Sequence, residues 1–255
     1  MTAFYDQLAS LYHLIYEDWD ATITVQAHQL ASIIAERWGL AAGAALLDVS
    51  CGIGTQAIGL AQRGFLVTAS DLSEQAIARA RVEAQRRSVV MDCSVCDMRE
   101  VSQHHQRQFD VVISCDNSIT HLLTDEDILL ALHQMYACVR PGGGCVLTVR
   151  DYAQEARGVG IVKPYGVRNV QGKRHFLFQV WDFTADIYDL ALYVVIDDPH
   201  VAQPMTHVMR SRYYAIGTDR LLALMEQAGF TSVTRLDGRF FQPILIGDKI
   251  AEPGS

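Results

Sequence analysis

Two apolar runs that each end in an acid, joined by a glycine-containing turn, constrain the fold of this chain more than any other feature. The first run ends at Asp48, and the turn behind it holds Gly52 and Gly54. The second run, Phe65–Asp71, ends in the other acid. Glycines permit a tight turn with positive φ and let a ligand approach backbone N–H groups. The pattern predicts half of a nucleoside-binding βαβ unit, with Asp71 placed to accept both hydroxyls of a ribose.

The pattern implies an adenosine-containing ligand, and Asp48 helps to decide whether that ligand is a dinucleotide. The spacing Gly52-x-Gly54-x-x-Ala57, with an acid about 20 residues further on, also fits the loose fingerprint of dinucleotide-binding proteins. An acid four residues before the first glycine, however, would lie beside a pyrophosphate at the helix N-terminus, where the ligand supplies the negative charge. A ligand with an ammonium and a sulfonium group would be attracted to the same carboxylate. A dinucleotide enzyme and a structural glycine turn remain the alternatives.

The pattern Asp48-x-x-x-Gly52-x-Gly54 resembles motif I of the class I S-adenosylmethionine-dependent methyltransferases. The resemblance implies an α/β, Rossmann-like fold with a doubly wound, mostly parallel seven-stranded sheet. It also implies S-adenosyl-L-methionine as the cofactor. Ser50 stands where this motif commonly has glycine or alanine, which is a minor departure.

Length and charge narrow the possible partners. The 255 residues fit one domain, or one domain that carries an insertion. The net charge of −8 argues against broad binding of nucleic acids or anionic membranes and favours a small-molecule substrate. No apolar run approaches the roughly 20 residues that span a bilayer, and the first residues lack the basic start of a signal peptide. We therefore expect a cytoplasmic protein; its oligomeric state is left open.

The six cysteines are scattered through apolar segments, which favours reduced thiols over disulfides. Cys93-x-x-Cys96 has the spacing of a metal-ligand pair, and His104 and His105 follow it. The two cysteines fall in a predicted strand, however, where their side chains would face opposite sides of a sheet. Buried thiols are therefore expected, and no metal.

Periodicity divides the chain into a helical cap over residues 1–40, a cofactor-binding core over 41–150, a lid over 151–216, and a closing helix and hairpin over 217–250. The cap reads as two helices, Phe4–Tyr16 and Ala21–Trp38. In the core, strands and helices alternate, which predicts a parallel sheet with helices on both faces. The predicted core strands are Ala44–Val49, Phe65–Ser70, Val89–Val95, Phe109–Cys115 and Gly144–Val149. The predicted core helices are Thr55–Gln62, Ser73–Arg87 and Asp125–Cys138.

The helical period vanishes after Asp151, and short runs of β-branched and aromatic residues take its place. They predict an antiparallel insertion over the carboxyl edge of the sheet. The expected strands are Arg174–Asp182, Asp189–Ile196 and His207–Ala215. A helix over Thr218–Ala228 and a hairpin of Thr231–Leu236 with Phe241–Ile246 then close the core, and the tail Ala251–Ser255 is expected to be disordered.

Ligands of such sheets bind beyond the carboxyl ends of the strands, and each of these ends carries a polar residue. In the methyltransferases that the chain resembles, an acid after the third strand accepts the adenine amino group, and an apolar neighbour covers the ring. That role transfers to Asp97 and Met98. An acidic loop without this function is the alternative. The predicted cofactor-binding residues are Asp48, Ser50, Gly52, Gly54, Asp71, Leu72, Asp97, Met98 and Cys115.

Residues 5–152 also resemble one particular branch of these methyltransferases. The segment Asn117-Ser118-x-x-His121-Leu122, the turn Pro141-Gly142-Gly143 and the pair Arg150-x-Tyr152 resemble the glycine/sarcosine N-methyltransferase branch. In that branch the asparagine and the arginine hold the amino-acid carboxylate, and a guanidinium can clasp a carboxylate through two parallel hydrogen bonds. The resemblance thus assigns this role to Asn117 and Arg150. A structural ion pair with Asp151 or another acid is the alternative for Arg150.

No strong base for the amine is evident in the sequence. His121 is a candidate, and the alternative is a histidine that only bonds its own loop. Tyr16 and Tyr152 are further candidates for the acceptor site, as are Tyr213 and Tyr214. The branch uses N-terminal tyrosines to line the pocket, but a core-facing aromatic stripe explains their spacing equally well. The residues of that stripe are Tyr5, Tyr12, Tyr16 and Trp19.

Asp116 departs from the glycine that usually precedes Asn-Ser in the animal glycine enzymes, and it adds a carboxylate near the methyl-transfer centre. That carboxylate would favour an amine-bearing substrate if it points inward. The sequence therefore predicts methyl transfer to a small molecule, favouring the nitrogen of a glycine- or sarcosine-like amino acid. The alternatives are O- or N-methylation of another metabolite or natural product, a non-catalytic S-adenosylmethionine-binding protein, and an NAD-linked oxidoreductase.

Overall fold

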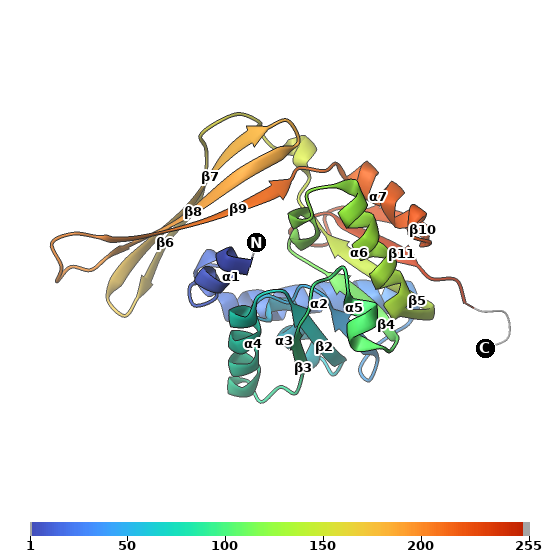
Figure 1. Cartoon of the computed structure of the whole chain (residues 1–255). Helices are drawn as coiled ribbons and strands as arrows, with labels where there is room; N and C mark the ends of the chain where they lie inside the picture. Colours follow the sequence, from blue (N-terminus) through green and yellow to red (C-terminus); the bar gives the residue numbers. More distant parts are fainter. Residues whose placement is uncertain (1, 252–255) are drawn as a thin grey trace.

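The computed structural model describes residues 2–251 and contains two β-sheets (Figure 1). The larger sheet has seven strands: β1 (Ala45–Asp48), β2 (Leu66–Asp71), β3 (Asp92–Val95), β4 (Phe109–Ser114), β5 (Val139–Thr148), β10 (Thr231–Leu236) and β11 (Ile244–Asp248). They lie in the order β10-β11-β5-β4-β1-β2-β3. Neighbours among β1 to β5 are parallel, whereas β11 is antiparallel to both β5 and β10. The predicted mostly parallel, seven-stranded fold is confirmed.

Helices cover both faces of this sheet. The helices are α2 (Trp19–Trp38), α3 (Thr55–Gln62), α4 (Glu74–Arg86), α5 (Val101–His105), α6 (Asp125–Cys138) and α7 (Thr218–Gln227). Because side chains alternate along a strand, Leu46 packs with α2, α3 and α4 while Leu47 packs with α5, α6 and α7. Cys93 and Cys96 also join different faces, so they do not form a ligand pair. The short α5 was not predicted, because five residues carry no helical period.

The lid is a separate antiparallel sheet of β6 (Ile161–Val170), β7 (Lys173–Thr184), β8 (Ile187–Asp197) and β9 (Met205–Tyr214). It projects from the core beside the N-terminus (Figure 1). The sequence predicted three of these strands and missed β6. That strand contains Pro164 and Gly166, and its register with β7 shifts between them. Proline is tolerated at a sheet edge or a bulge, which is the place that β6 occupies.

The N-terminal cap differs from its prediction. The single helix expected over Phe4–Tyr16 is two pieces, α1 (Thr2–Leu8) and the 3-10 helix η1 (Tyr12–Ile15). The turn between them lets Leu14 join Leu8 in the apolar cluster under the lid. Tertiary packing against β7, β8 and β9 therefore overrides the continuous helical pattern.

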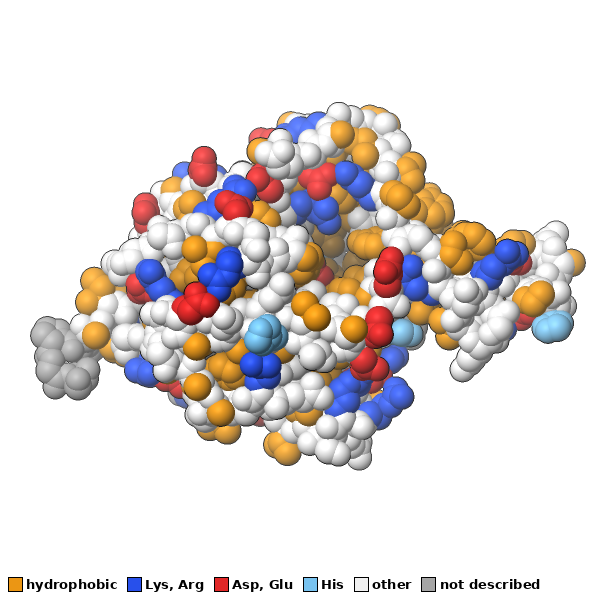
Figure 2. Space-filling view, turned by 180° about the vertical axis from the view of Figure 1, so that it is seen from behind, with side chains coloured by type: hydrophobic (Ala, Val, Ile, Leu, Met, Phe, Trp, Pro, Cys, Tyr) orange, Lys and Arg blue, Asp and Glu red, His pale blue; other side chains and the backbone are white. Residues whose placement is uncertain are grey.

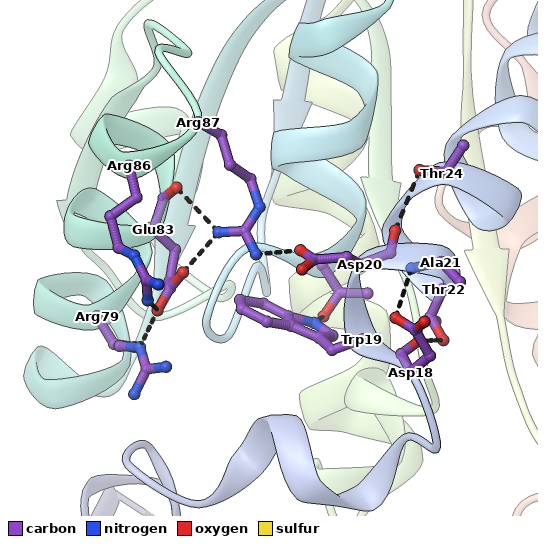
Figure 3. Close-up of polar contacts among 11 residues, drawn as sticks. Asp18, Trp19, Asp20, Ala21, Thr22, Thr24, Arg79, Glu83, Arg86 and Arg87 are labelled. Carbon is purple, nitrogen blue, oxygen red and sulfur yellow. Dashed lines mark hydrogen bonds and ion pairs between the residues drawn. The ribbon is translucent and has the colours of Figure 1, made fainter.

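A buried acid fastens the cap to the core (Figure 3). Glu83 of α4, only 1% exposed, accepts hydrogen bonds from Arg79, Arg86 and Arg87. Arg87 also pairs with Asp20 of α2, and its guanidinium lies 4.8 Å from the centre of the Trp19 ring. The Trp19 Nε1–H group donates to Thr55 Oγ1 over 2.9 Å. These contacts fix the start of α2, which borders the candidate site.

The closing hairpin begins its second strand later than predicted. Phe240, Phe241 and Gln242 lie in the loop before β11, not in a strand. Pro243 lacks the N–H group that a central strand donates, which explains the late start. Of the predicted disordered tail, residues 252–255 lie outside the described residues. Within residues 2–251, no helix has the length and hydropathy needed to cross a bilayer.

Candidate active site

The carboxyl ends of β1 to β5 meet at one edge of the larger sheet, and the cap and the lid cover this edge. Strand β9 contacts the 3-10 helix η2 (Ser118–His121), which follows β4, and α1 contacts both β9 and α4. Polar side chains from the ends of several strands therefore converge in one enclosed region, as expected for a doubly wound sheet.

The glycine turn has the predicted shape. Gly52 and Gly54 have φ values of +53° and +97°, and Gly54 caps the N-terminus of α3. A Cβ on Gly54 would lie 2.8 Å from Ile58 Cδ1. The Gly52 N–H group donates a 2.8 Å hydrogen bond to Asp71 Oδ2, and Ser73 N–H donates to Asp71 Oδ1. Each carboxylate oxygen retains a lone pair, so Asp71 can still accept two ribose hydroxyls.

Asp48 lies at the end of β1 and is 1% exposed. Its Oδ1 accepts the Ser50 N–H group over 3.1 Å, whereas its buried Oδ2 has no hydrogen-bond partner among the described residues. Burial, with a contribution from the nearby Asp71, raises the pKa of Asp48 to about 7. A buried carboxylate oxygen without a partner is costly unless a cation or donor reaches it. Asp48 therefore fits a positively charged ligand.

A cavity of about 60 Å³ lies beside Asp71, under the N-terminal cap. Ligand sites usually occupy about 300–1,000 Å³, so entry of a nucleoside requires the cap to move. Asp6 of α1 holds the cap in place, because it accepts the Ser73 Oγ–H group over 2.5 Å. The lining includes six predicted cofactor residues, namely Ser50, Gly52, Asp71, Leu72, Asp97 and Met98, and two cap residues, Tyr5 and Tyr12.

Asp97 lines this cavity, but its carboxylate is already paired. Arg99 donates to Oδ1 from its backbone N–H and its Nε–H and to Oδ2 from Nη2, the last over 2.7 Å. Asp97 can accept an adenine amino group only through a remaining lone pair. Met98 packs against the apolar cluster on one face of the sheet, next to the same cavity. The predicted adenine contacts of both residues remain predictions.

A narrower cavity continues past the glycine turn toward the end of β4. It shares Tyr12, Ser50 and Gly52 with the first cavity and adds Tyr16, Cys115 and Asp116. The two cavities thus lie next to each other along the glycine turn, and their lining residues extend from Asp71 to Asp116.

Asp116 lies where three cavities meet. It lines the narrow cavity, a small cavity under the lid and a large open cleft. Tyr16 donates to its Oδ2 and Gln242 donates to its Oδ1, each over 3.2 Å. Its φ of +56° is left-handed, which aspartate tolerates and which glycine adopts freely. Burial raises the pKa of Asp116, and Arg150 offsets part of that rise.

Asn117 and Arg150 are neighbours, but much of their hydrogen-bonding capacity is used within the protein. Asn117 accepts the Arg150 backbone N–H group over 3.0 Å and donates from Nδ2 to Tyr152 Oη over 2.7 Å. Arg150 Nη1 donates to Glu155 over 2.9 Å. The buried Nε of Arg150 has no hydrogen-bond partner among the described residues. Arg150 thus forms the ion pair that was its alternative interpretation, with Glu155 in place of Asp151, while its Nε–H group has no partner among the described residues.

His121 joins the cap to the lid. The Tyr5 hydroxyl lies 2.6 Å from its Nε2, Ser211 Oγ lies 3.3 Å from its Nδ1, and Tyr213 packs on its ring. Burial lowers the pKa of His121 to about 3. Such a group is a weak base at neutral pH. His121 also lines the cavity beside Asp71 and is absent from the lining of the cavities that include Asp116.

The aromatic residues of the cap divide between two roles. Tyr5, Tyr12 and Tyr16 line the cavities, whereas Trp19 packs in the core. Tyr213 lines the small cavity under the lid, and Tyr214 instead donates to Asp125 at the start of α6.

Sequence reasoning missed several residues that line the site. Glu155, Tyr165, Phe240, Phe241 and Gln242 all face the open cleft or contact Asp116 or Arg150. Pro243 was the available signal, because it marks the end of a loop and not the middle of a strand. Glu155 and Tyr165 lie in the lid, where no motif of the sequence pointed to them.

The sequence is similar to those of known methyltransferases. Residues 46–143 match the model of a methyltransferase domain family. A glycine/sarcosine N-methyltransferase from Parasynechococcus marenigrum is 30% identical over 57% of this chain and 50% of its own length. A ubiquinone biosynthesis O-methyltransferase from Pseudomonas paraeruginosa is 35% identical over 45% of this chain and 47% of its own. The chain thus spans about half the length of the curated relatives it matches.

Among solved structures, the S-adenosylmethionine-bound amino pentose methyltransferase CalS10 from Micromonospora echinaspora superposes with a TM-score of 0.78. The match covers 94% of this chain and 95% of that chain at 20% identity, so it shows the fold. The unpartnered oxygen of Asp48 and the free lone pairs of Asp71 fit the cationic nucleoside that such domains bind. Residues 46–143 therefore match a methyltransferase domain, and the chain has the fold of S-adenosylmethionine-dependent methyltransferases, as its glycine turn predicted.

Proposed function

We propose that the chain transfers a methyl group from S-adenosylmethionine to the amine nitrogen of a small molecule. The observation that carries this proposal is the position of Asp116, which lines the narrow cavity at the glycine turn, the small cavity under the lid and the open cleft. No lysine or arginine among the described residues forms an ion pair with this carboxylate. Asp116 is partly buried, and an ammonium group is the natural partner for such a carboxylate when it has no ion-pair partner.

Asp116 would act on the amine in two ways. When bound, S-adenosylmethionine would supply a methyl group on a sulfonium, and an amine nitrogen attacking that methyl group in line would release S-adenosylhomocysteine as the leaving group. Asp116 binds the ammonium form of the acceptor and then accepts its proton, which frees the nitrogen lone pair. Burial makes this carboxylate a stronger base than an exposed aspartate, because it raises the pKa. Tyr16 and Gln242 keep both oxygens in place during the transfer.

The remaining contribution of the chain is orientation. Tyr12 and Tyr16, which are both partly buried, line the narrow cavity on the cap side and shield it from water. Holding two reactants in line at close distance supplies much of the rate enhancement of such displacements. A mobile cap that closes only over bound cofactor would serve this purpose.

A glycine- or sarcosine-like amino acid is one acceptor that fits this proposal. Its carboxylate would bind the free Nε–H group of Arg150, and its ammonium group would bind Asp116. The partial similarity to a glycine/sarcosine N-methyltransferase supports it. Another amine-bearing metabolite is the second candidate, and the open cleft beside Asp116 favours it.

The test incubates the purified protein and labelled S-adenosylmethionine with a panel of amines, amino acids and phenols. We expect S-adenosylhomocysteine to form only with amines. Asp116→Asn should lower kcat by about 100-fold while the affinity for S-adenosylmethionine is retained. Asp189→Asn, at an exposed position of the lid, is the matched control. Turnover of phenols alone, or full activity in Asp116→Asn, would contradict the proposal, and cofactor binding without any turnover would indicate a non-catalytic protein.

A further inference from the structure

The open cleft beside Asp116 is much larger than a small amino acid requires. Its volume is about 970 Å³, and it lies between the start of α2, the lid and the loop before β11. Figure 2 shows a hollow between the body and the projecting lid, with hydrophobic side chains in its wall. Sites for drug-sized ligands have about 300–1,000 Å³. The cleft therefore has room for an acceptor with a substantial body.

The rim of the cleft exposes apolar side chains. Val25 of α2 is 53% exposed and Phe241 is 54% exposed, and both belong to the lining. Ile15, Phe240 and Pro243 extend the same wall. Apolar area that faces water in a concave site is stabilised when a ligand covers it, by about 25 cal/mol per Å². The cleft thus suits an acceptor whose body is apolar.

The charges of the cleft favour a cation over a zwitterion. Glu17, Asp18 and Asp116 line it without an ion-pair partner among the described residues. Arg150 is the cation in the lining, and a protein carboxylate already neutralises it, because Glu155 Oε1 accepts from its Nη1 over 2.9 Å. The other oxygen of Glu155 pairs with Lys163 over 2.5 Å.

Trp181 helps to hold the two cations that pair with Glu155. The Arg150 guanidinium and the Lys163 ammonium each lie 5.0 Å from the centre of the Trp181 ring. Glu155 therefore already neutralises the guanidinium to which an amino-acid substrate would present its own carboxylate. A substrate carboxylate would have to compete with a partner that is held at high effective concentration by the chain.

We propose that the acceptor is a cationic amine with an apolar body and no adjacent carboxylate, which lies in this cleft with its amino group at Asp116. The inference rests on the proposed function, since it takes Asp116 as the group that receives the amine. It narrows the substrate class and assigns Glu155 the role of excluding amino acids. Phe241 and Val25 then determine specificity by contact with the body of the acceptor.

The test titrates the protein, saturated with S-adenosylhomocysteine, with 2-phenylethylamine, glycine and sarcosine in a calorimeter. We expect 2-phenylethylamine to bind at least about tenfold more tightly than either amino acid. Phe241→Ser should weaken its binding by about tenfold, because it removes one aromatic contact. Val90→Ser, at a position 93% exposed in the loop before β3, is the control and should leave the affinity unchanged.

A second variant tests the role of Glu155. Glu155→Gln keeps the shape of the side chain but leaves Arg150 and Lys163 without its charge, so sarcosine should bind more tightly and 2-phenylethylamine more weakly. Tighter binding of glycine or sarcosine to the unmodified protein, no binding of 2-phenylethylamine, or no effect of Phe241→Ser would overturn the inference. These outcomes are distinct from failure of the proposed function, which would appear as the absence of labelled methyl transfer to any amine, amino acids included.

Discussion

The backbone N–H group of Gly52 donates a hydrogen bond to the carboxylate of Asp71, so the glycine turn after β1 is tied to the end of β2. One carboxylate thereby performs two tasks. It fixes the conformation of the turn, and it lines the cavity under the cap. Asp71 therefore has a structural role in the glycine turn in addition to its predicted contact with the ligand.

Replacing Asp71 should weaken cofactor binding strongly. Asp71→Asn removes the charge that both backbone N–H donors and the ribose hydroxyls require, and hydrogen bonds to a charged group contribute about 1.5–3 kcal/mol each. We expect the Kd for S-adenosylmethionine to rise by about 10- to 100-fold in calorimetry. Asp92→Asn, at the exposed start of β3, is the control. An unchanged Kd in Asp71→Asn would remove the assignment of the ribose site.

Asp48 should make cofactor binding depend on pH. A cation favours the ionised carboxylate, whose pKa in the free protein is about 7. Affinity for S-adenosylmethionine should therefore rise as the pH increases from 6 to 8 and level off above the pKa. Calorimetry across this range measures the effect, and Asp48→Asn should bind weakly with a flat profile. A wild-type affinity that is independent of pH would contradict this role.

The same group should cost stability at alkaline pH. The folded state raises the pKa of Asp48 above its unfolded value of 3.8, so the folded protein binds more protons between these values and loses stability as the pH rises through them. We expect Asp48→Asn to have a higher Tm than the unmodified protein at pH 8 in the absence of cofactor. If the Tm of Asp48→Asn were equal to or lower than that of the unmodified protein, the ionised Asp48 carboxylate would not be destabilising, despite its unpartnered Oδ2.

The core and the glycine turn could be predicted because they depend on local signals. The apolar run to Asp48, the positive φ of Gly52 and Gly54, and the acid at Asp71 are all determined by sequence neighbours. The sequence singled out Asp116 only because it differs from the glycine that is usual at this position in the animal glycine enzymes. Its environment comes from Tyr16, 100 residues before it, and Gln242, 126 residues after it.

The lid and the cap were harder to predict for physical reasons. Strand β6 carries Pro164 and Gly166, which weaken a strand signal although an edge strand tolerates them. The turn between α1 and η1 is set by packing under a lid whose strands are more than 100 residues away. The pairing of Arg150 with Glu155 depends on the loop geometry after β5, so the sequence favoured a substrate carboxylate in its place.

The Glu83 cluster should contribute substantially to stability. Glu83→Gln leaves Arg79 and Arg87 without their buried counterion and loosens the contact of α4 with the start of α2. We expect a loss of about 2–4 kcal/mol in the free energy of unfolding, measured by urea denaturation. Arg86→Ala is the matched control, because that side chain is 68% exposed and its pair should contribute at most about 1 kcal/mol. If the two variants lost similar amounts of unfolding free energy, burial of Glu83 would not be the reason that these ion pairs stabilise the protein.

His121 should act as a structural contact and not as the catalytic base. Its pKa is about 3 in the folded state and lies near 6.5 when unfolded, so the unfolded chain binds more protons between these values. Stability should therefore fall as the pH is lowered from 6.5, by up to about 1.4 kcal/mol per pH unit from this group. Thermal unfolding between pH 4.5 and 7.5 should show a shallower slope for His121→Gln than for the unmodified protein. In the same variant kcat should retain most of its value at pH 8, whereas a loss as large as that of Asp116→Asn would return His121 to the role of base.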